Sequence, residues 1–293
     1  MTDVSVLGLG AMGGALARTL CTADFETTVW NRSASRATPL VKLGARHAET
    51  PAAAVDAAQV VLVCVDDYIA AESFLRTPET EVALRGRTLV QLSSGSPRQA
   101  RYTKAWTEVL GALYVDGAIM GFPGEIGGRE TTILVSGNPA GYEYAEPVLR
   151  ALAGNSVFLG DDAGLASTLD QALLSGMLGL IVGVLNGVVQ CEAGGFPTRE
   201  YPAILGALMT RVGAQGQQVA QTAIDGSYRE TDASLRTWAH TVNRMTATAR
   251  EAGASDEYPR FLGELLNRAT EAGSGEHDIA ALVETLRKPP PKN

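Results

Sequence analysis

The sequence predicts an α/β fold in which a doubly wound, mainly parallel sheet is followed by one long helix and an all-α region. Three observations lead to this prediction. From residue 3 to about residue 160, short apolar runs alternate with helically spaced segments, as in a parallel sheet covered by helices on both faces. A glycine-rich turn joins the first apolar run to the first helical segment. Beyond about residue 162 the alternation stops and the periodicity is almost entirely helical.

We place the domain boundaries where this rhythm changes. The α/β domain is expected over 1–161, the long helix over 162–192 and a helical domain over 193–288. The remaining 289–293 belong to the run "KPPPKN", which cannot continue a helix and is expected to be a disordered tail.

Six runs in the first domain have the character of strands. They are almost continuously apolar, which is typical of parallel strands buried on both faces. The runs are "VSVLGLG" (4–10), "ETTVWN" (26–31), "AQVVLVCV" (58–65), "RTLVQLSS" (87–94), "LYVDGAI" (113–119) and "TTILVSG" (131–137).

Three helices are expected between these strands. Two lie at "GALARTLCTA" (14–23) and "SRATPLVKLGA" (35–45). The third, "SPRQARYTKAWTEVLGA" (96–112), is amphipathic and begins with Ser96 as its cap and Pro97 at its first position.

The long helix contains an apolar run, "ALLSGMLGLIVGVLNGVV" (172–189), of 18 uncharged residues. Its length would suit a membrane span. It is a single segment without a basic flank, and Asp170, Gln171, Asn186 and Gln190 punctuate it, so we predict a buried helix of a soluble protein.

Glycine recurs along this helix at three- and four-residue steps, which predicts that another helix backbone packs close to it. The stripe is formed by Gly176, Gly179, Gly183 and Gly187. Further helices are expected near 198–223, 233–252, 257–272 and 277–287. A helix that is apolar all round needs cover on every side. We therefore predict an intertwined homodimer in which a second copy supplies that cover.

Composition excludes several partners and sites. The net charge is −8 and Lys and Arg are scattered, which disfavours a nucleic-acid partner. The three cysteines are odd in number and widely spaced, which favours reduced thiols and a cytoplasmic location. The three histidines lack metal-ligand spacing, so no metal is expected. The start of the chain shows no basic-then-apolar leader.

The turn "GLGAMG" predicts a dinucleotide site. Gly8, Gly10 and Gly13 form G-x-G-x-x-G between a strand and a helix, the context of a Rossmann domain. Gly8 permits the tight turn, Gly10 lets the pyrophosphate approach the backbone and Gly13 allows close helix–strand packing. The phosphates would lie at the helix N-terminus. The other expected cofactor contacts are Leu9, Ala11, Met12, Cys64, Val65 and Ser94.

The end of the second strand favours NADPH over NADH. An NAD site would normally place Asp or Glu there, but the sequence reads "VWNRS". A guanidinium pairs with a 2′-phosphate and stacks on adenine, whereas an acid would repel it. The expected phosphate ligands are Asn31, Arg32, Ser33 and Arg36.

The motifs "GLGAMG", "VWNRS", "LVCVDDY", "QLSSGSPRQAR" and "DGAIMGFPGEIG" resemble the imine reductases, a branch of the β-hydroxyacid dehydrogenase and 6-phosphogluconate dehydrogenase superfamily. In the hydroxyacid enzymes a catalytic lysine follows the sheet; the resemblance places Thr168 at that position. Many imine reductases carry Asp or Tyr two places later, here Asp170. The resemblance implies an NADPH-dependent oxidoreductase in which Asp170 is catalytic.

A carboxylate suits an imine substrate. Hydride adds more readily to a protonated C=N bond, and a nearby carboxylate stabilises that positive charge. In its acid form the carboxyl could also deliver the proton, since burial raises a carboxyl pKa. Asp170 could instead cap or solvate the start of the long helix.

The substrate pocket is expected to combine a polar and an apolar wall. The resemblance places Ser94 against the nicotinamide and substrate, and an intertwined dimer would let the helix "LRTWAHTVNRM" close the partner's pocket. The expected pocket residues are Ser94, Met120, Phe122, Pro123, Leu174, Leu178, Trp238 and His240.

The function implied is NADPH-dependent reduction of a cyclic imine or iminium to a chiral amine, with reductive amination of ketones as a further activity. A second interpretation is a β-hydroxyacid dehydrogenase or short aldehyde reductase, and the missing lysine counts against it. A third, of another class, is a non-catalytic NADPH-binding sensor or scaffold.

Overall fold

The computed structural model describes residues 3–287, so the expected tail at 289–293 lies outside the described residues. The chain divides into two compact units, the first ending at Ser175 and the second beginning at Gly176. Each unit is described by itself below.

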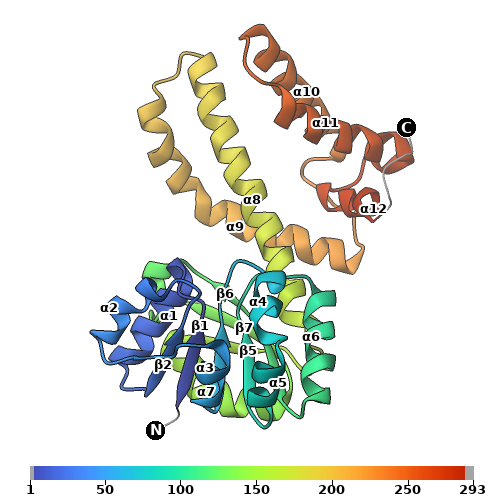
Figure 1. Cartoon of the computed structure of the whole chain (residues 1–293). Coiled ribbons are helices and arrows are strands. Elements are labelled where there is room, and N and C mark those ends of the chain that lie inside the picture. Colours follow the sequence, from blue (N-terminus) through green and yellow to red (C-terminus); the bar gives the residue numbers. More distant parts are fainter. Residues whose placement is uncertain (1–2, 288–293) are drawn as a thin grey trace. The chain divides into compact units, whose positions relative to one another are not determined.

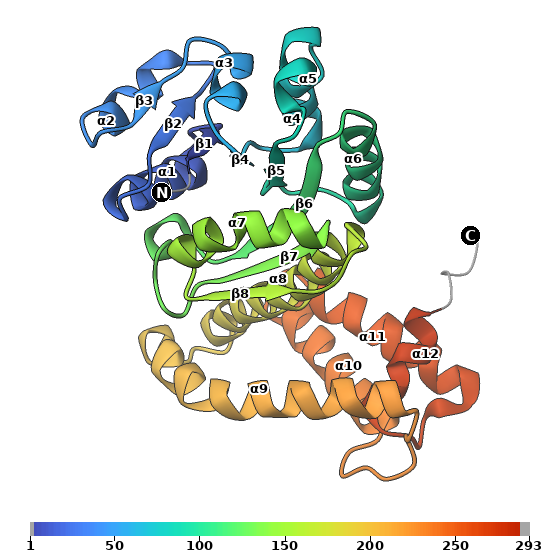
Figure 2. The same ribbon diagram turned by 90° about the horizontal axis from the view of Figure 1, so that it is seen from below.

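The first unit is built on one eight-stranded sheet in the order β3-β2-β1-β4-β5-β6-β7-β8 (Figures 1 and 2). Neighbouring strands are parallel except for the antiparallel pair β6 and β7. The strands are β1 (Val4–Leu7), β2 (Thr27–Trp30), β3 (Arg46–His47), β4 (Val60–Val63), β5 (Thr88–Gln91), β6 (Leu113–Met120), β7 (Thr132–Gly137) and β8 (Asn155–Phe158). The predicted fold class and all six predicted strands are confirmed, while β3 and β8 were not predicted.

Helices cover both faces of this sheet (Figure 2). One core contains Val4, Val6 and side chains of α1, α2 and α7, and the other contains Leu7, Val61 and side chains of α3, α4, α5 and α6. The helices are α1 (Ala11–Thr22), α2 (Thr38–Val41), α3 (Pro51–Asp56), α4 (Tyr68–Leu75), α5 (Pro78–Leu84), α6 (Pro97–Val109) and α7 (Pro139–Leu152), with short 3-10 turns at η1 (Ala34–Arg36) and η2 (Pro123–Glu125). The strand side chains alternate between the two cores, which is why the runs are apolar throughout.

Four of these helices begin at a hydroxyl- or amide-bearing residue followed by proline. The side chains of Thr50, Thr77, Ser96 and Asn138 each accept a hydrogen bond from the backbone N–H three residues later. Proline then stands at the first helical position, where its missing N–H costs nothing. The cap predicted for α6 is confirmed.

The second unit is all helical. Its helices are the remainder of α8 (Gly164–Ala193), α9 (Tyr201–Asp225), α10 (Leu235–Glu251), α11 (Glu257–Ala269) and α12 (Leu282–Leu286), with short turns at η3 (Thr198–Glu200), η4 (Thr270–Ser274) and η5 (Ile279–Ala281). Leu235, Val242 and Leu266 lie at the centre of its core. The four predicted helical segments and the long helix are confirmed.

Much of the apolar run of α8 is exposed within residues 3–287. Leu178 and Leu185 are 56% and 60% exposed, and the predicted burial of this helix by a second copy stays a prediction. By length and composition α8 is the one helix among residues 3–287 that could cross a membrane, a property shared by helices that bury themselves in soluble proteins. An apolar face of α8 is therefore exposed within the described part of the chain.

Within residues 3–287, the atoms found close to the glycine stripe belong to tyrosine side chains, and the packing of a helix backbone against it stays a prediction. A Cβ on Gly183 would meet the hydroxyl of Tyr258 at 2.9 Å, and one on Gly187 would meet the hydroxyl of Tyr201 at 2.1 Å. No atom of the described chain lies within 4 Å of a Cβ on Gly176 or Gly179. Tyrosine side chains use the space at two of the four positions.

Candidate active site

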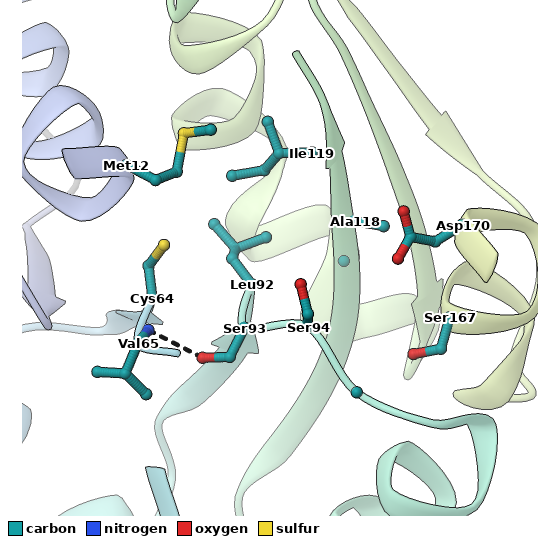
Figure 3. Close-up of a pocket in the computed structure, with 12 residues that line it drawn as sticks. Met12, Cys64, Val65, Leu92, Ser93, Ser94, Ala118, Ile119, Ser167 and Asp170 are labelled. Carbon is teal, nitrogen blue, oxygen red and sulfur yellow. Dashed lines mark hydrogen bonds between the residues drawn. The ribbon is translucent and has the colours of Figure 1, made fainter. Parts of the chain in front are cut away.

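A pocket of about 200 Å³ lies in the first unit, at the carboxyl ends of β1, β4 and β5 (Figure 3). Chain order reverses between β1 and β4, and open α/β sheets bind ligands at this kind of switch point. The pocket is lined by Met12, Cys64, Val65, Leu92, Ser93, Ser94, Gly95, Gly117, Ala118, Ile119, Ser167 and Asp170. Of the predicted site residues, it brings together Met12, Cys64, Val65, Ser94 and Asp170.

The glycine turn has the shape needed for a pyrophosphate. Gly8 has a φ of +97°, and a Cβ there would lie 2.3 Å from the Cys64 carbonyl oxygen. A Cβ on Gly13 would lie 2.0 Å from the Gly8 carbonyl oxygen. A Cβ on Gly10 would meet nothing closer than the Arg36 Nη1 atom, at 4.0 Å. Gly8 and Gly13 are therefore needed for the turn itself, whereas Gly10 leaves open space in front of it.

The start of α1 is free to bind an anion. Gly10 is the N-cap of α1 and has no side chain to accept a hydrogen bond from the first turn. The N–H groups of Ala11 and Met12 open the helix next to the pocket, where the helix dipole also favours negative charge. The residues present thus fit a dinucleotide phosphate.

Two of the predicted phosphate ligands hold the glycine turn. The Asn31 side-chain oxygen accepts the Leu9 N–H at 2.9 Å, and its amide donates to the Ser33 carbonyl at 3.1 Å. Arg36 donates from Nη1 to the Leu9 carbonyl at 3.2 Å. These bonds join the end of β2 to the turn after β1. Arg32 and Ser33 are exposed on the same loop.

Asp170 presents a buried carboxylate to the pocket. It is only 9% exposed, and Figure 3 shows its carboxylate beside Ala118, directed toward the pocket. No hydrogen-bond donor within residues 3–287 contacts this carboxylate, and burial raises the pKa of Asp170 above its ordinary value. A buried carboxylate without a partner is costly, and a cationic ligand in the pocket would remove that cost. The geometry excludes the alternative that Asp170 caps α8, because the helix begins six residues earlier at Gly164.

The first turn of α8 is fixed to the rest of the first unit by polar contacts. Arg101 donates to both carboxylate oxygens of Asp162, each at 2.8 Å, and the Gly164 N–H donates to Asp162 at 3.0 Å. The bonds from Arg101 are the main reason that the pKa of Asp162 is lowered to about 2. Ser136 of β7 donates to the Ala163 carbonyl and accepts the Ala166 N–H, both at 2.9 Å.

Several pocket residues were missed by the sequence analysis. Ser93 accepts the Val65 N–H at 3.0 Å and so joins the ends of β4 and β5. Leu92 and Ser93 adjoin the predicted Ser94, and they could have been found because they end a buried strand at the expected edge. Ser167 lies one helical turn before Asp170. Gly117, Ala118 and Ile119 form the β6 wall.

The other predicted substrate residues do not line this pocket. Phe122 is 70% exposed on the loop after β6, next to Pro123, and Met120 packs beside Ala118 instead. Leu174 is half-buried and Leu178 exposed on α8. In the second unit Trp238 packs against the core of α10 and α11, and His240 is exposed.

Comparisons with known proteins agree with this geometry. A model of the NAD binding domain of 6-phosphogluconate dehydrogenase matches residues 3–160. A model of the C-terminal domain of NADPH-dependent reductive aminase-like proteins matches residues 162–288. The NADPH-dependent reductive aminase of Aspergillus oryzae is 32% identical over 287 residues, which cover 97% of each chain.

Solved structures extend the likeness to the fold. The imine reductase of Myxococcus stipitatus in complex with NADP+ gives a TM-score of 0.93 at 33% identity, with 97% of this chain and 99% of that chain covered. The reductive aminase of Aspergillus terreus in complex with NADPH and ethyl-5-oxohexanoate gives 0.91 at 35% identity, with 98% and 100% covered. The chain belongs to the family of NADPH-dependent reductive aminases and imine reductases.

Proposed function

We propose that this protein is an NADPH-dependent imine reductase that transfers hydride to the C=N carbon of a cyclic imine or iminium and releases an amine. The observation that carries the proposal is the buried carboxylate of Asp170, which accepts no hydrogen bond from residues 3–287 and lies in a pocket beside the nucleotide turn. We also propose reductive amination as a second activity, in which the same site binds a ketone and an amine.

The turn between β1 and α1 and the loop after β2 would hold the cofactor. The free N–H groups at the start of α1 would bind the pyrophosphate, and Arg32 and Ser33 would bind the 2′-phosphate. Asn31 and Arg36 stabilise the turn through Leu9. When bound, NADPH supplies the hydride for the reduction.

Asp170 stabilises the positive charge of the iminium. Its electrostatic effect is strengthened because most of the side chain is buried in the pocket wall. Burial raises the pKa of Asp170, so its acid form can also donate a proton to the imine nitrogen.

The pocket disfavours a hydroxyacid substrate. None of the residues that line it in the described structure is Lys or Arg, so a substrate carboxylate would meet Asp170 without a compensating cation. Thr168, at the position of the hydroxyacid enzymes' lysine, is exposed. Both features favour a neutral or cationic substrate.

We also propose that the protein is a cytoplasmic homodimer in which a second copy covers the apolar faces of α8 and α9. Leu185 of α8 and Ile204 of α9 are 60% and 50% exposed in the single chain, and large exposed apolar faces mark interaction surfaces. Met120, Phe122, Pro123, Leu174, Leu178, Trp238 and His240 remain candidates for the substrate wall of such a dimer.

The test compares NADPH consumption with 2-methyl-1-pyrroline, ketones and aldehydes, and measures NADP+ reduction with 3-hydroxyacids. The imine should be the preferred substrate, and Asp170→Asn and Asp170→Ala should lower kcat by at least about 100-fold while NADPH binding stays within about twofold, since removing one charge-stabilising group typically costs this much. Preferential turnover of a hydroxyacid or aldehyde would support the second interpretation. Binding of NADPH together with only slow reduction of every imine by wild type, and no further slowing in Asp170→Ala, would support the sensor.

A further inference from the structure

A second buried carboxylate, Asp116, lies behind the pocket wall on β6. It is 1% exposed, and no Lys or Arg in the described chain forms an ion pair with it. Its partners are hydroxyl groups. Tyr114 donates to Oδ1 at 3.1 Å, Tyr68 donates to the same oxygen, and Ser167 donates to Oδ2 at 2.7 Å. The two tyrosine oxygens are themselves 3.0 Å apart.

The protonation states of this cluster are set by burial. Burial is the main cause that raises the pKa of Asp116 to about 6, and its three hydroxyl partners oppose that shift. Burial and then the Asp116 charge raise the pKa values of Tyr68 and Tyr114 far above normal, so both phenols stay protonated. At neutral pH a carboxylate that can only accept therefore faces three groups that donate.

The neighbours of Asp116 within the sheet are neutral. Gln91 of β5 and Ser136 of β7 stand opposite it in register. Tyr68 comes from α4, Tyr114 from β6 and Ser167 from α8. Hydrogen bonds to a charged, buried acceptor are stronger than those between neutral groups. Asp116 thus ties three elements together, and one of them is the helix that carries Asp170.

The link to Asp170 follows from helix geometry. Ser167 and Asp170 are three residues apart on α8, which places them on one face, and both line the pocket. The side chain of Asp170 makes no hydrogen bond within residues 3–287. Its position therefore depends on how the surrounding turn of α8 is held. Two polar contacts hold that face: Ser167 donates to Asp116 in the core, and the Gln171 amide donates to the Gly95 carbonyl at the pocket rim, at 3.1 Å.

We propose that Asp116 and Ser167 are positioning residues: the hydrogen bond from Ser167 to the buried Asp116 fixes the turn of α8 that directs the Asp170 carboxylate into the pocket. This inference rests on the proposed role of Asp170 in imine reduction. A displacement of about 1 Å can cost about 100-fold in rate, so a contact that makes no bond to substrate can still matter for turnover.

The main variant is Ser167→Ala, which removes one hydroxyl and favours the helix. Its matched control is Thr168→Ala, which removes the neighbouring hydroxyl; that hydroxyl is exposed and bonds only to the Gly164 carbonyl of its own helix in the described structure. Ser167→Ala should lower kcat for 2-methyl-1-pyrroline by about 10- to 100-fold. NADPH affinity should stay within about twofold, and Thr168→Ala should behave as wild type. Wild-type turnover in Ser167→Ala would overturn the proposal.

A double-mutant cycle separates positioning from a general loss of stability. If Ser167 acts through Asp170, adding Ser167→Ala to Asp170→Asn should cause no further loss of rate. Multiplied losses in the double variant would contradict the proposal. Asp116→Asn should resemble Ser167→Ala, and if it does not fold, Ser167→Ala still decides the question.

Hydrogen exchange gives a readout without turnover. The amides of 164–171 should exchange faster in Ser167→Ala than in Thr168→Ala, because only the former loses the contact with β6. Equal exchange would refute the anchoring. If wild type reduces no imine, the proposed function fails, whereas exchange still tests the anchor.

Discussion

The glycine turn allows cofactor binding to be separated from folding by adding single methyl groups. A Cβ on Gly13 would lie 2.0 Å from the Gly8 carbonyl oxygen, so backbone must move to admit it. A Cβ on Gly10 would have its nearest neighbour 4.0 Å away, and the Gly10 φ of −65° suits alanine. Gly13→Ala should therefore damage the free protein, whereas Gly10→Ala should damage only its complex with NADPH.

The magnitudes follow from these contacts. Overpacking at Gly13 should cost about 1–3 kcal/mol, and each kcal/mol lowers Tm by roughly 2–4 °C in a domain of this size. At Gly10, alanine reduces the entropy of the unfolded chain but is a poorer N-cap than glycine, so stability should change by less than about 1 kcal/mol. A methyl group in the space of the pyrophosphate should raise the Kd for NADPH at least about tenfold, or about 1.4 kcal/mol.

Thermal unfolding with and without NADPH measures both effects. At a concentration 100 times the wild-type Kd, NADPH should stabilise wild type by about 2.7 kcal/mol and Gly10→Ala by about half as much. Gly14→Ala is the matched control, because its Cβ would lie 3.9 Å from the Leu9 carbonyl oxygen, an ordinary contact. A full NADPH shift in Gly10→Ala, or a wild-type Tm for free Gly13→Ala, would refute the assigned roles.

Three further predictions concern charge and assembly. Because burial raises the pKa of Asp116 from 3.8 to about 6, its ionisation costs the native state about 3 kcal/mol; this cost is absent below pH 3.8 and complete above pH 6. In urea titrations wild type should therefore lose stability relative to Asp116→Asn as pH rises from about 4 to 7, and a difference that is constant with pH would contradict this. Arg32→Ala should weaken NADPH binding in fluorescence titrations at least about tenfold more than NADH binding, and equal weakening would rule out the phosphate contact. Wild type should sediment as a dimer and Leu185→Glu as a monomer, because the variant would bury a charge; a monomeric wild type would exclude the proposed cover of α8.

Elements that leave a pattern in a short stretch of sequence could be predicted from the sequence alone. Six strands were visible because each is buried on both faces, and the turn at Gly8 was visible because strand and helix signals flank it. The strands β3 and β8 were missed since β3 has two exposed residues and β8 is only half-buried. Short helices such as α3 and α5 lack periodicity, but their Thr-Pro starts at Thr50 and Thr77 were readable.

The site was predictable only in part, because long-range contacts bring it together. Tyr68 and Ser167 are 48 and 51 residues away from Asp116 in the sequence, and each donates a hydrogen bond to it. Hydrophobic periodicity cannot reveal contacts between residues so far apart in the chain. One local signal was available, since Asp116 interrupts an otherwise apolar strand, as Asp170 interrupts an apolar helix. For Asn31, the sequence revealed the position of the residue but not its hydrogen bonds. Its position after β2 was recognised, but its bonds to Leu9 and Ser33 depend on the folded turn.

The two buried carboxylates, Asp116 and Asp170, differ in whether their oxygens are free to interact with a ligand. Asp116 uses both oxygens on three hydroxyls, which offset part of the cost of burying its charge, and it does not line the pocket that a substrate enters. Asp170 has a raised pKa from burial and no hydrogen-bond partner within the described residues, so its desolvation is uncompensated until a cation or hydrogen-bond donor enters the pocket. A free protein that retains this cost is less stable than one with a neutral residue there, and the difference becomes available as binding free energy for an iminium. The same residue type thus serves as anchor where its bonds are complete and as reactive group where they are missing.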